Sequence, residues 1–391
     1  MKEEKAKAPA PKRLQKPNIA VRLMALAVTT ALVLGALLLV VYRDTYNLDA
    51  VKRWLASRSQ DSGEAAPFTH AGGDKLSIAY LDSGVVTAST AGAHYYSLDG
   101  TPQADEVLSM ENPVLSSSRT TAVVYDAGNQ DLFVFRNGEE TFRLTLEGNN
   151  DLLSARVNDS GWLAVTAQQS RHKGAVTVYD NRGGEVIGIG LTTAFAVDAA
   201  VSPDRKTVAV VTIGQESGSF FSRLLFYPVN QQEPSAQVDL GSLMVLDLDY
   251  EDDVLWVLGE DRLITVTPDG GTVQTFLFSP SYLKGCSLGG DGFAFLLTGR
   301  YRSGSADQAV ILNKNAQAVH SMSLPSQVLD YAAEGDYCGL LSGSRLVLYN
   351  SSLEQYGVLE DLQAARRLDL TPSGSALLSN SQQAWLYIPQ S

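Results

Sequence analysis

Residues 174–188 read GAVTVYDNRGGEVIG. Apolar and polar side chains alternate over the first six positions, a polar cluster with two glycines follows, and a second apolar run ends the stretch. Alternation is typical of a half-buried β-strand, and Asn, Asp and Gly tolerate the positive φ angles of tight turns. The stretch therefore predicts a β-hairpin, and similar stretches recur along the chain.

The hairpin belongs to a unit that occurs eight times from residue 75 to the C-terminus. In each unit an apolar strand, a polar turn and a second apolar strand precede a hairpin of this kind. The first strands are predicted to end at Leu81, Leu115, Val157, Val201, Tyr250, Leu288, Ala333 and Leu370. Successive ends lie 34, 42, 44, 49, 38, 45 and 37 residues apart, a mean of about 41, which is the period of a four-stranded propeller blade. The sequence predicts an all-β propeller over residues 75–391, with eight blades, or seven if one unit is misread.

The last unit ends at Ser391 after its third strand. An open propeller would expose unpaired strand edges, and ring closure removes that hazard. We therefore expect residues 67–72, PFTHAG, to supply the outermost strand of the last blade.

The turns VSPDR (201–205) and LTPSG (370–374) and the segment VYDNRGG (178–184) resemble the degenerate blades of bacterial quinoprotein-like and Trp-Asp-repeat (WD40-like) propellers. This resemblance covers residues 67–391, although no Trp-Asp dipeptide occurs in the third strands. The order of basic tail, apolar span, linker and acidic propeller is similar to an uncharacterised family of single-pass bacterial membrane proteins with a domain of unknown function. That similarity implies a fold and a topology but no activity.

Residues 23–42, LMALAVTTALVLGALLLVVY, are the strongest local signal. As a helix they reach about 30 Å, the thickness of a bilayer's hydrocarbon core. They exceed the apolar region of a cleaved signal peptide, so we expect an uncleaved signal anchor, a single-pass transmembrane helix. Residues 1–22 contain seven Lys or Arg and two Glu and are expected to be a disordered cytoplasmic tail, with the rest of the chain extracytoplasmic. Residues 43–74 are expected to form an amphipathic stalk and a linker.

Charge and motifs exclude several functions. The net charge is −13, and the basic tail makes the remainder still more acidic, so we expect no nucleic-acid partner. No H-E-x-x-H, G-x-S-x-G or C-x-x-C spacing occurs, and the four histidines fall in different units, so we expect no metal site built on histidine or cysteine, and no cofactor other than the calcium considered below. Cys286 and Cys338 lie in adjacent units; an exported compartment permits a disulfide, while burial is usual for free cysteine.

An acid recurs near the ends of the first strands, which are innermost in a propeller. These acids are Asp198, Asp247, Asp249, Asp330 and Asp369. They share one face of their strands, and we expect them to ring the channel mouth formed by the strand starts, where they would bind calcium or a basic peptide. The alternative is that they accept backbone N–H groups or pair with Arg156 and Arg367 on the same face.

Two long loops, residues 212–223 and 298–308, both join a second strand to a third and should project from one face. Phe220, Phe221, Tyr301 and Arg302 within them are residue types enriched at protein interfaces, unless they fold back onto the blades. Together these features predict a membrane-anchored, extracytoplasmic, monomeric propeller that binds an envelope protein or peptide and is not an enzyme. The alternatives are a hydrolase, lyase or quinone-dependent dehydrogenase, or a ligand or cation sensor, using the channel acids.

Overall fold

The computed structural model describes residues 62–390, except 149, 252, 326, 363 and 364. Every regular element in this part is a β-strand. None of the described residues forms a helix long and apolar enough to cross a membrane. The predicted tail, the span 23–42 and most of the stalk lie outside the described residues.

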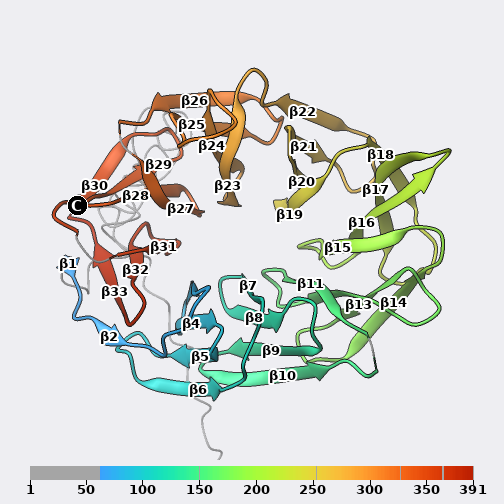
Figure 1. Cartoon of the computed structure of the whole chain (residues 1–391), viewed down its shortest axis with the longest axis horizontal. Coiled ribbons are helices and arrows are strands. Elements are labelled where there is room, and N and C mark those ends of the chain that lie inside the picture. Colours follow the sequence, from blue (N-terminus) through green and yellow to red (C-terminus); the bar gives the residue numbers. More distant parts are fainter. Residues whose placement is uncertain (1–61, 149, 252, 326, 363–364, 391) are drawn as a thin grey trace, which may run out of the picture. The chain divides into compact units, whose positions relative to one another are not determined.

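Eight antiparallel sheets form the blades of one ring (Figure 1). Blade 1 contains β3 (Ser77–Leu81), β4 (Gly84–Ser89), β5 (Gly92–Tyr96) and β6 (Pro102–Glu106), and blade 2 contains β7 (Pro113–Ser117), β8 (Thr121–Asp126), β9 (Asp131–Arg136) and β10 (Glu139–Thr145). Blade 3 contains β11 (Leu152–Val157), β12 (Leu163–Ala167), β13 (Gly174–Tyr179) and β14 (Glu185–Leu191), and blade 4 contains β15 (Phe195–Val201), β16 (Thr207–Glu216), β17 (Ser219–Pro228) and β18 (Ala236–Gly241). Blade 5 contains β19 (Val245–Glu251), β20 (Val254–Gly259), β21 (Arg262–Val266) and β22 (Val273–Leu277), and blade 6 contains β23 (Tyr282–Gly290), β24 (Phe293–Gly299), β25 (Gln308–Asn313) and β26 (Ala318–Ser323). Blade 7 contains β27 (Val328–Glu334), β28 (Tyr337–Ser342), β29 (Leu346–Asn350) and β30 (Gln355–Leu359), and blade 8 contains β31 (Arg367–Leu370), β32 (Ala376–Ser379), β33 (Gln383–Ile388), β1 (Gly63–Glu64) and β2 (Phe68–Thr69). The eight-blade prediction is confirmed, and the seven-blade alternative is wrong.

The hairpin at residues 174–188 joins β13 to β14, the third and fourth strands of blade 3. Asp180 Oδ1 accepts the backbone N–H groups of Arg182 and Gly184, each at 2.8 Å. Gly183 has a φ of +79°, and a Cβ there would lie 2.5 Å from the ring of Phe142 in the preceding blade. Asp180 and Gly183 are therefore turn residues, required by backbone geometry and by close packing between blades.

The core lies between neighbouring blades. The second strand of a blade is buried on both faces, as in β4 and β8, whereas the outermost strand alternates between exposed and half-buried side chains, as in β10. The described residues form eight apolar clusters, and each joins two neighbouring blades. The cluster between blades 8 and 1 is the smallest, with only Val85, Leu377 and Ala384 fully buried.

The chain closes the ring within blade 8. Strand β33 pairs with β32 on one side and with both β1 and β2 on the other (Figure 1). Strand β2 falls inside residues 67–72, and β1 extends this outer edge five residues toward the N-terminus. The propeller therefore begins at Gly63, because the segment before blade 1 belongs to the sheet of blade 8.

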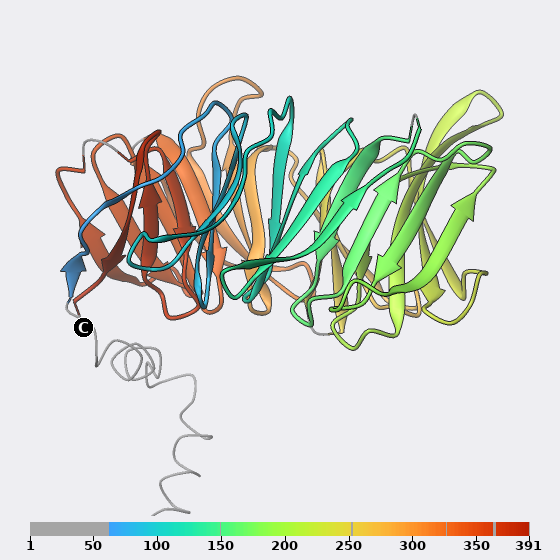
Figure 2. The same cartoon turned by 90° about the horizontal axis from the view of Figure 1, so that it is seen from below.

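The ring has two different faces. We call the face at which the innermost strands begin the start face, and the face at which they end the end face. Phe195 of β15 pairs with Ile213 of β16, and Tyr282 of β23 pairs with Gly299 of β24. The connections from second to third strands therefore lie on the start face, where the long β16–β17 hairpin projects beyond its neighbours (yellow-green in Figure 2).

Candidate functional site

A β-bulge recurs in the innermost strands. The register shifts between Ala196 and Asp198, between Val245 and Asp247, and between Val328 and Asp330, and equivalent shifts occur in β11 and β23. A bulge disrupts the local hydrogen-bond ladder. The aspartate after each of the three bulges supplies an acceptor for the next backbone N–H: Ala199 and Leu248, each at 2.9 Å, and Tyr331. This local geometry explains why an acid recurs three residues from the predicted strand end.

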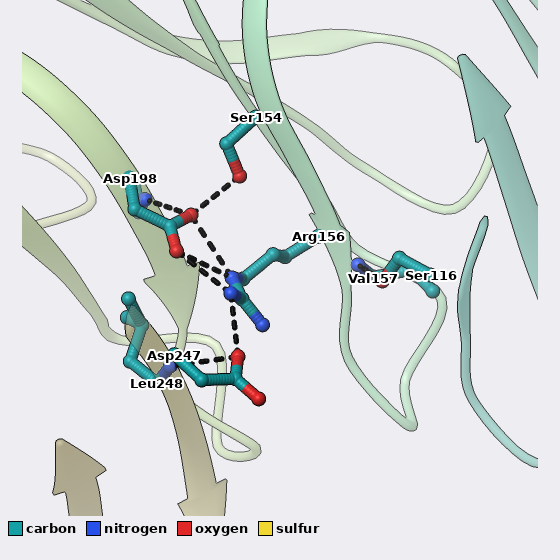
Figure 3. A network of polar contacts seen from close by, with 8 residues as sticks. Ser116, Ser154, Arg156, Val157, Asp198, Asp247 and Leu248 are labelled. Carbon is teal, nitrogen blue, oxygen red and sulfur yellow. Dashed lines mark hydrogen bonds and ion pairs between the residues drawn. The ribbon is translucent and has the colours of Figure 1, made fainter. Parts of the chain in front are cut away.

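One arginine joins two of these aspartates across three blades (Figure 3). Arg156 of β11 donates through Nε and Nη2 to Asp198 of blade 4 at 2.7–2.9 Å, and its Nη2 also contacts Asp247 Oδ1 of blade 5 at 2.6 Å. The Ser154 hydroxyl donates to Asp198 Oδ1 at 2.5 Å. Burial opposes the positive charge of Arg156, but Asp198 and Asp247 outweigh it and raise the guanidinium pKa above its ordinary value.

Two other predicted acids bind backbone groups of the following blade. Asp330 Oδ2 accepts the N–H of Leu368 at 2.9 Å, and Asp369 Oδ2 accepts the N–H of Tyr80 at 2.7 Å. These contacts join blade 7 to blade 8 and blade 8 to blade 1. Four of the five acids are therefore held by an arginine or by backbone N–H groups, as the structural alternative anticipated.

Residues of all eight blades line a central cavity of about 600 Å³. It lies at the ends of the innermost strands, so the expectation of a site at their starts is wrong: the acids lie one to four residues before the strand ends, which places them on the end face. The charged residues that line it are Asp159, Asp247, Asp249, Glu251, Asp291, Glu334, Asp369, Arg119 and Arg156. Asp198 and Asp330 do not line it.

Four of these carboxylates, Asp159, Glu251, Asp291 and Glu334, were missed in the sequence. Each lies in a segment that the sequence pattern predicts as the turn after a first strand, in VNDSG, YEDDV, LGGDG and AEGDY. In the structure Glu251 and Glu334 are the last residues of β19 and β27. The signal was present, but acids in tight turns are usually explained by turn geometry. Only the ring shows that these turns meet around one cavity.

Enclosure by the ring disfavours carboxylate charge in the cavity. Asp249 is accessible from the cavity but surrounded by protein, and this desolvation raises its pKa to about 8, with Arg156 lowering it and Asp247 raising it further. Desolvation, followed by Asp369, raises the pKa of Glu334 to about 8. The pKa of Asp369 rises only to about 6, because burial is opposed by the N–H of Tyr80. Within the described part of the chain, Asp249 and Glu334 have no hydrogen-bond or ion-pair partner.

The remaining candidate ligands are dispersed. No group of three or more His, Cys, Asp or Glu among the described residues is arranged to hold a metal ion. Cys286 of β23 and Cys338 of β28 are both free thiols. Burial raises the pKa of each.

The start face collects exposed apolar side chains. Eight of those at blades 4 to 7 are Phe195, Ile213, Phe220, Met244, Leu246, Tyr282, Tyr301 and Leu329. Leu246 also lines the central cavity. Leu246 and Leu329 are the extra residues of their bulges, which explains why they are 47% and 41% exposed. In a strictly alternating strand, Leu246 and Leu329 would point to the face opposite the aspartate that follows each of them, and that face is buried. The sequence pattern therefore did not predict their exposure.

Three of the four predicted interface residues are exposed on this face. Phe220 and Tyr301 are each 75% exposed, and Arg302 is exposed while its carbonyl accepts a hydrogen bond from Lys284 Nζ. Phe221 differs: it is half-buried, with the guanidinium of Arg223 4.0 Å from its ring centroid. Phe221 therefore folds back onto the hairpin.

Two pockets open at blade seams beside these side chains. One of about 480 Å³ lies between blades 3 and 4, and its apolar lining includes Leu153, Phe195 and Ile213. Another of about 370 Å³ lies between blades 6 and 7, where Leu329 and Tyr331 contribute to its wall. Each pocket could admit a side chain of a bound protein.

The sequence matches a family model described as a family of unknown function (DUF5711) over residues 66–354. Among curated proteins, no sequence matches this chain. Similar solved structures include the computationally designed Ika8 protein (TM-score 0.58, 11% identity, covering 82% of this chain and 97% of that chain) and BamB from Moraxella catarrhalis (TM-score 0.52, 14% identity, 84% and 100%). A structure of the eukaryotic initiation factor has a TM-score of 0.51 at 11% identity, covering 78% and 81%. These likenesses show the fold alone. Because the family model covers most of the chain, from β2 to β29 and including blades 1 to 6 in full, this protein belongs to the DUF5711 family.

Proposed function

We propose that this protein is a membrane-anchored propeller of the cell envelope that binds another protein through its start face. The observation that carries the proposal is the gathering of eight exposed, large apolar side chains at blades 4 to 7 beside two seam pockets. Monomeric proteins rarely expose large apolar patches without a partner, and aromatic side chains dominate binding energies. Phe220 and Tyr301 are the two most exposed of these aromatic residues.

Charge favours the same face. Two acids beside the apolar side chains are paired with arginines: Glu216 with Arg223 at 2.8 Å and Asp307 with Arg300 at 3.5 Å. The end face instead carries the carboxylates of the central cavity. A partner with an apolar, weakly charged surface would therefore bind the start face with little electrostatic penalty.

The proposed topology leaves this face accessible. The chain reaches the propeller at β1, where Glu64 pairs with Tyr387 near the end of β33, on the end-face side of blade 8. The segment between the proposed span 23–42 and Gly63 contains 20 residues, which extend at most about 70 Å. The propeller is thereby tethered near the membrane while its start face can meet a neighbouring protein.

Site-specific photo-crosslinking of the full-length chain in its native membrane tests this proposal. A photoreactive residue at position 220 or 301 should capture the same partner. Matched positions are Leu98, in the turn between β5 and β6, and Val319, on the outermost strand β26, because both are 47% exposed. Capture at none of the positions, or equally at all four, would contradict binding by the start face.

A matched pair of substitutions separates binding from stability. Phe220→Ser and Tyr301→Ser should abolish co-purification of the partner and change the free energy of unfolding by less than about 0.5 kcal/mol, as is usual for exposed sites. A loss of stability comparable to a core substitution would show that these side chains support the fold instead.

The central cavity supports a second candidate function, binding of a cationic peptide segment. Asp249 and Glu334 line it with no hydrogen-bond or ion-pair partner among the residues that the structure describes, and an incoming Lys or Arg would favour their charged forms. Binding near pH 7 should then release protons, because both groups have a pKa of about 8 in the free protein.

Calorimetry of the full-length protein with a lysine-rich peptide, in two buffers of different ionisation enthalpy, measures this release. Proton release that disappears in the Asp249→Asn, Glu334→Gln variant supports the site; binding without proton release, or none, rejects it. A parallel titration with Ca²⁺ tests the cation-sensor alternative, which requires a thermal shift.

A further inference from the structure

Closure of the ring depends on few contacts. The seam between blades 8 and 1 has the smallest apolar cluster among the described residues. The closing segment is held by β1 and β2, each of two residues, and by the N–H groups of Ala65 and His70, which donate to Leu386 and Gln382 at 2.8 and 2.9 Å. Two side chains add to these bonds: Trp385 Nε1 donates to Glu64 at 2.9 Å, and the hydroxyl oxygen of Tyr96 accepts the N–H of Ala71 at 2.7 Å. A further bond to the β32–β33 turn therefore adds to a small set of contacts.

His70 supplies such a bond from a buried position. Its side chain is only 4% exposed. Nδ1 lies 3.0 Å from the carbonyl oxygen of Ala71, and Nε2 lies 3.0 Å from the carbonyl oxygen of Asn380 in the β32–β33 turn. Both partners are carbonyls, which only accept hydrogen bonds.

The protonation state of the ring decides whether both contacts are bonds. A neutral imidazole carries one N–H, so one of its nitrogens would face a carbonyl lone pair with its own lone pair. An imidazolium donates from both nitrogens and satisfies both carbonyls. The cost of burying its charge opposes this gain, so the charged and neutral forms compete.

The titratable groups around His70 do not compete with the two carbonyl oxygens for its imidazole. The charged or titratable residues on the surrounding elements are Asp74 and Lys75 of the same segment, His94, Tyr96 and Asp105 of blade 1, and Arg366 of blade 8. His94 is paired with Asp105 at 3.0 Å, and Lys75 Nζ donates to Glu111 O at 2.7 Å. Within the described residues, none of these side chains has a hydrogen bond to the imidazole of His70.

We infer that His70 is a pH-sensitive latch that ties the N-terminal closing segment to the β32–β33 turn more strongly when doubly protonated. Deprotonation removes one of its two bonds and loosens the seam between blades 8 and 1. The latch is therefore stronger where the imidazole carries both protons than where it carries one, because only the doubly protonated ring donates to both carbonyls. This inference does not depend on the proposed partner surface.

Hydrogen exchange of the full-length protein measures the latch. After correction for intrinsic rates, the protection of residues 63–70 relative to β12 should fall about three- to tenfold between about pH 5.5 and about pH 8, as expected for loss of one hydrogen bond. His70→Gln should remove this dependence on pH, whereas His94→Gln, at the other buried histidine, should retain it. Equal relative protection at both pH values would overturn the inference.

A variant that keeps His70 guards against misfolding of the His70→Gln protein. The chain has four histidines, so the triple variant His94→Gln, His172→Gln, His320→Gln leaves His70 as the only imidazole. It should reproduce the wild-type pH dependence of protection. A flat profile in a folded triple variant would assign the effect to another histidine.

Discussion

Replacement of Arg156 by methionine should uncouple blades 3, 4 and 5. Its guanidinium lies 2.7 Å from Asp198 Oδ2 and 2.6 Å from Asp247 Oδ1. Methionine keeps much of the side-chain length but leaves the two carboxylates facing each other without a cation. The free energy of unfolding at neutral pH should therefore fall.

The magnitude follows from burial. Removing one partner from a buried ion pair costs about 3–5 kcal/mol. Because the side chains of Arg156 and Asp247 are 27% and 38% exposed, solvent screens part of this, and we expect a loss of about 2–4 kcal/mol. Unfolding entropy of about 2.1 cal/mol/K per residue gives about 0.7 kcal/mol/K for a ring of roughly 330 residues, so the melting temperature should fall by about 3–6 °C.

Arg143 provides a matched control. It also contacts two carboxylates, Glu106 and Glu140 at 2.5 and 2.8 Å, but its side chain is 48% exposed. Arg143→Met should therefore cost no more than about 1 kcal/mol in denaturant unfolding. The triple variant Arg156→Met, Asp198→Asn, Asp247→Asn should recover most of the loss, since neutral amides need no cation. Equal losses for Arg156→Met and Arg143→Met would refute the reasoning.

Three further predictions concern other parts of the ring. Asp249→Asn should raise the melting temperature, and the gain should grow as pH rises from about 4 to about 8, because a carboxyl whose pKa is raised from 3.8 to about 8 destabilises the folded state over that range; a gain that is constant with pH would contradict this origin. Cys286 and Cys338 should both react with a thiol reagent in denaturant and far more slowly in the native protein, since both are free and burial raises the pKa of each; fewer than two reactive thiols in denaturant would indicate a disulfide. Phe68→Ala should cost about 1–3 kcal/mol in chemical denaturation, because the half-buried ring packs 5.5 Å from that of Tyr96 at the closing seam, whereas Phe220→Ala should change stability by less than about 0.5 kcal/mol; similar losses would show that closure does not depend on this contact.

Sequence patterns predicted the blades because the position of a strand within its blade is visible in the order of apolar and polar residues along that strand. The predicted end of the first strand is the observed end for β3, β11, β15 and β31, and β7 ends at Ser117, two residues beyond the predicted Leu115. Fourth strands with alternating burial were also recognisable from their polar positions. The incomplete last unit indicated that an N-terminal segment completes blade 8. Two strands of that segment pair with β33, and only β2 lies within the predicted residues 67–72, because β1 precedes them.

The central cavity and the apolar start face depend on contacts that no local pattern contains. Arg156 meets Asp198 and Asp247 only because the ring brings three innermost strands together. The alternating pattern also assumes an unbroken register, whereas the bulge before Asp247 exposes Leu246 as well.

The sequence by itself determined the all-β repeat and its eight units, because alternation and turn chemistry act over a few residues. Only the tertiary structure decided that the acids meet at the strand ends and that the apolar side chains gather on the opposite face. The physical reason is that ring closure and small register shifts decide which distant side chains become neighbours and which are turned toward solvent.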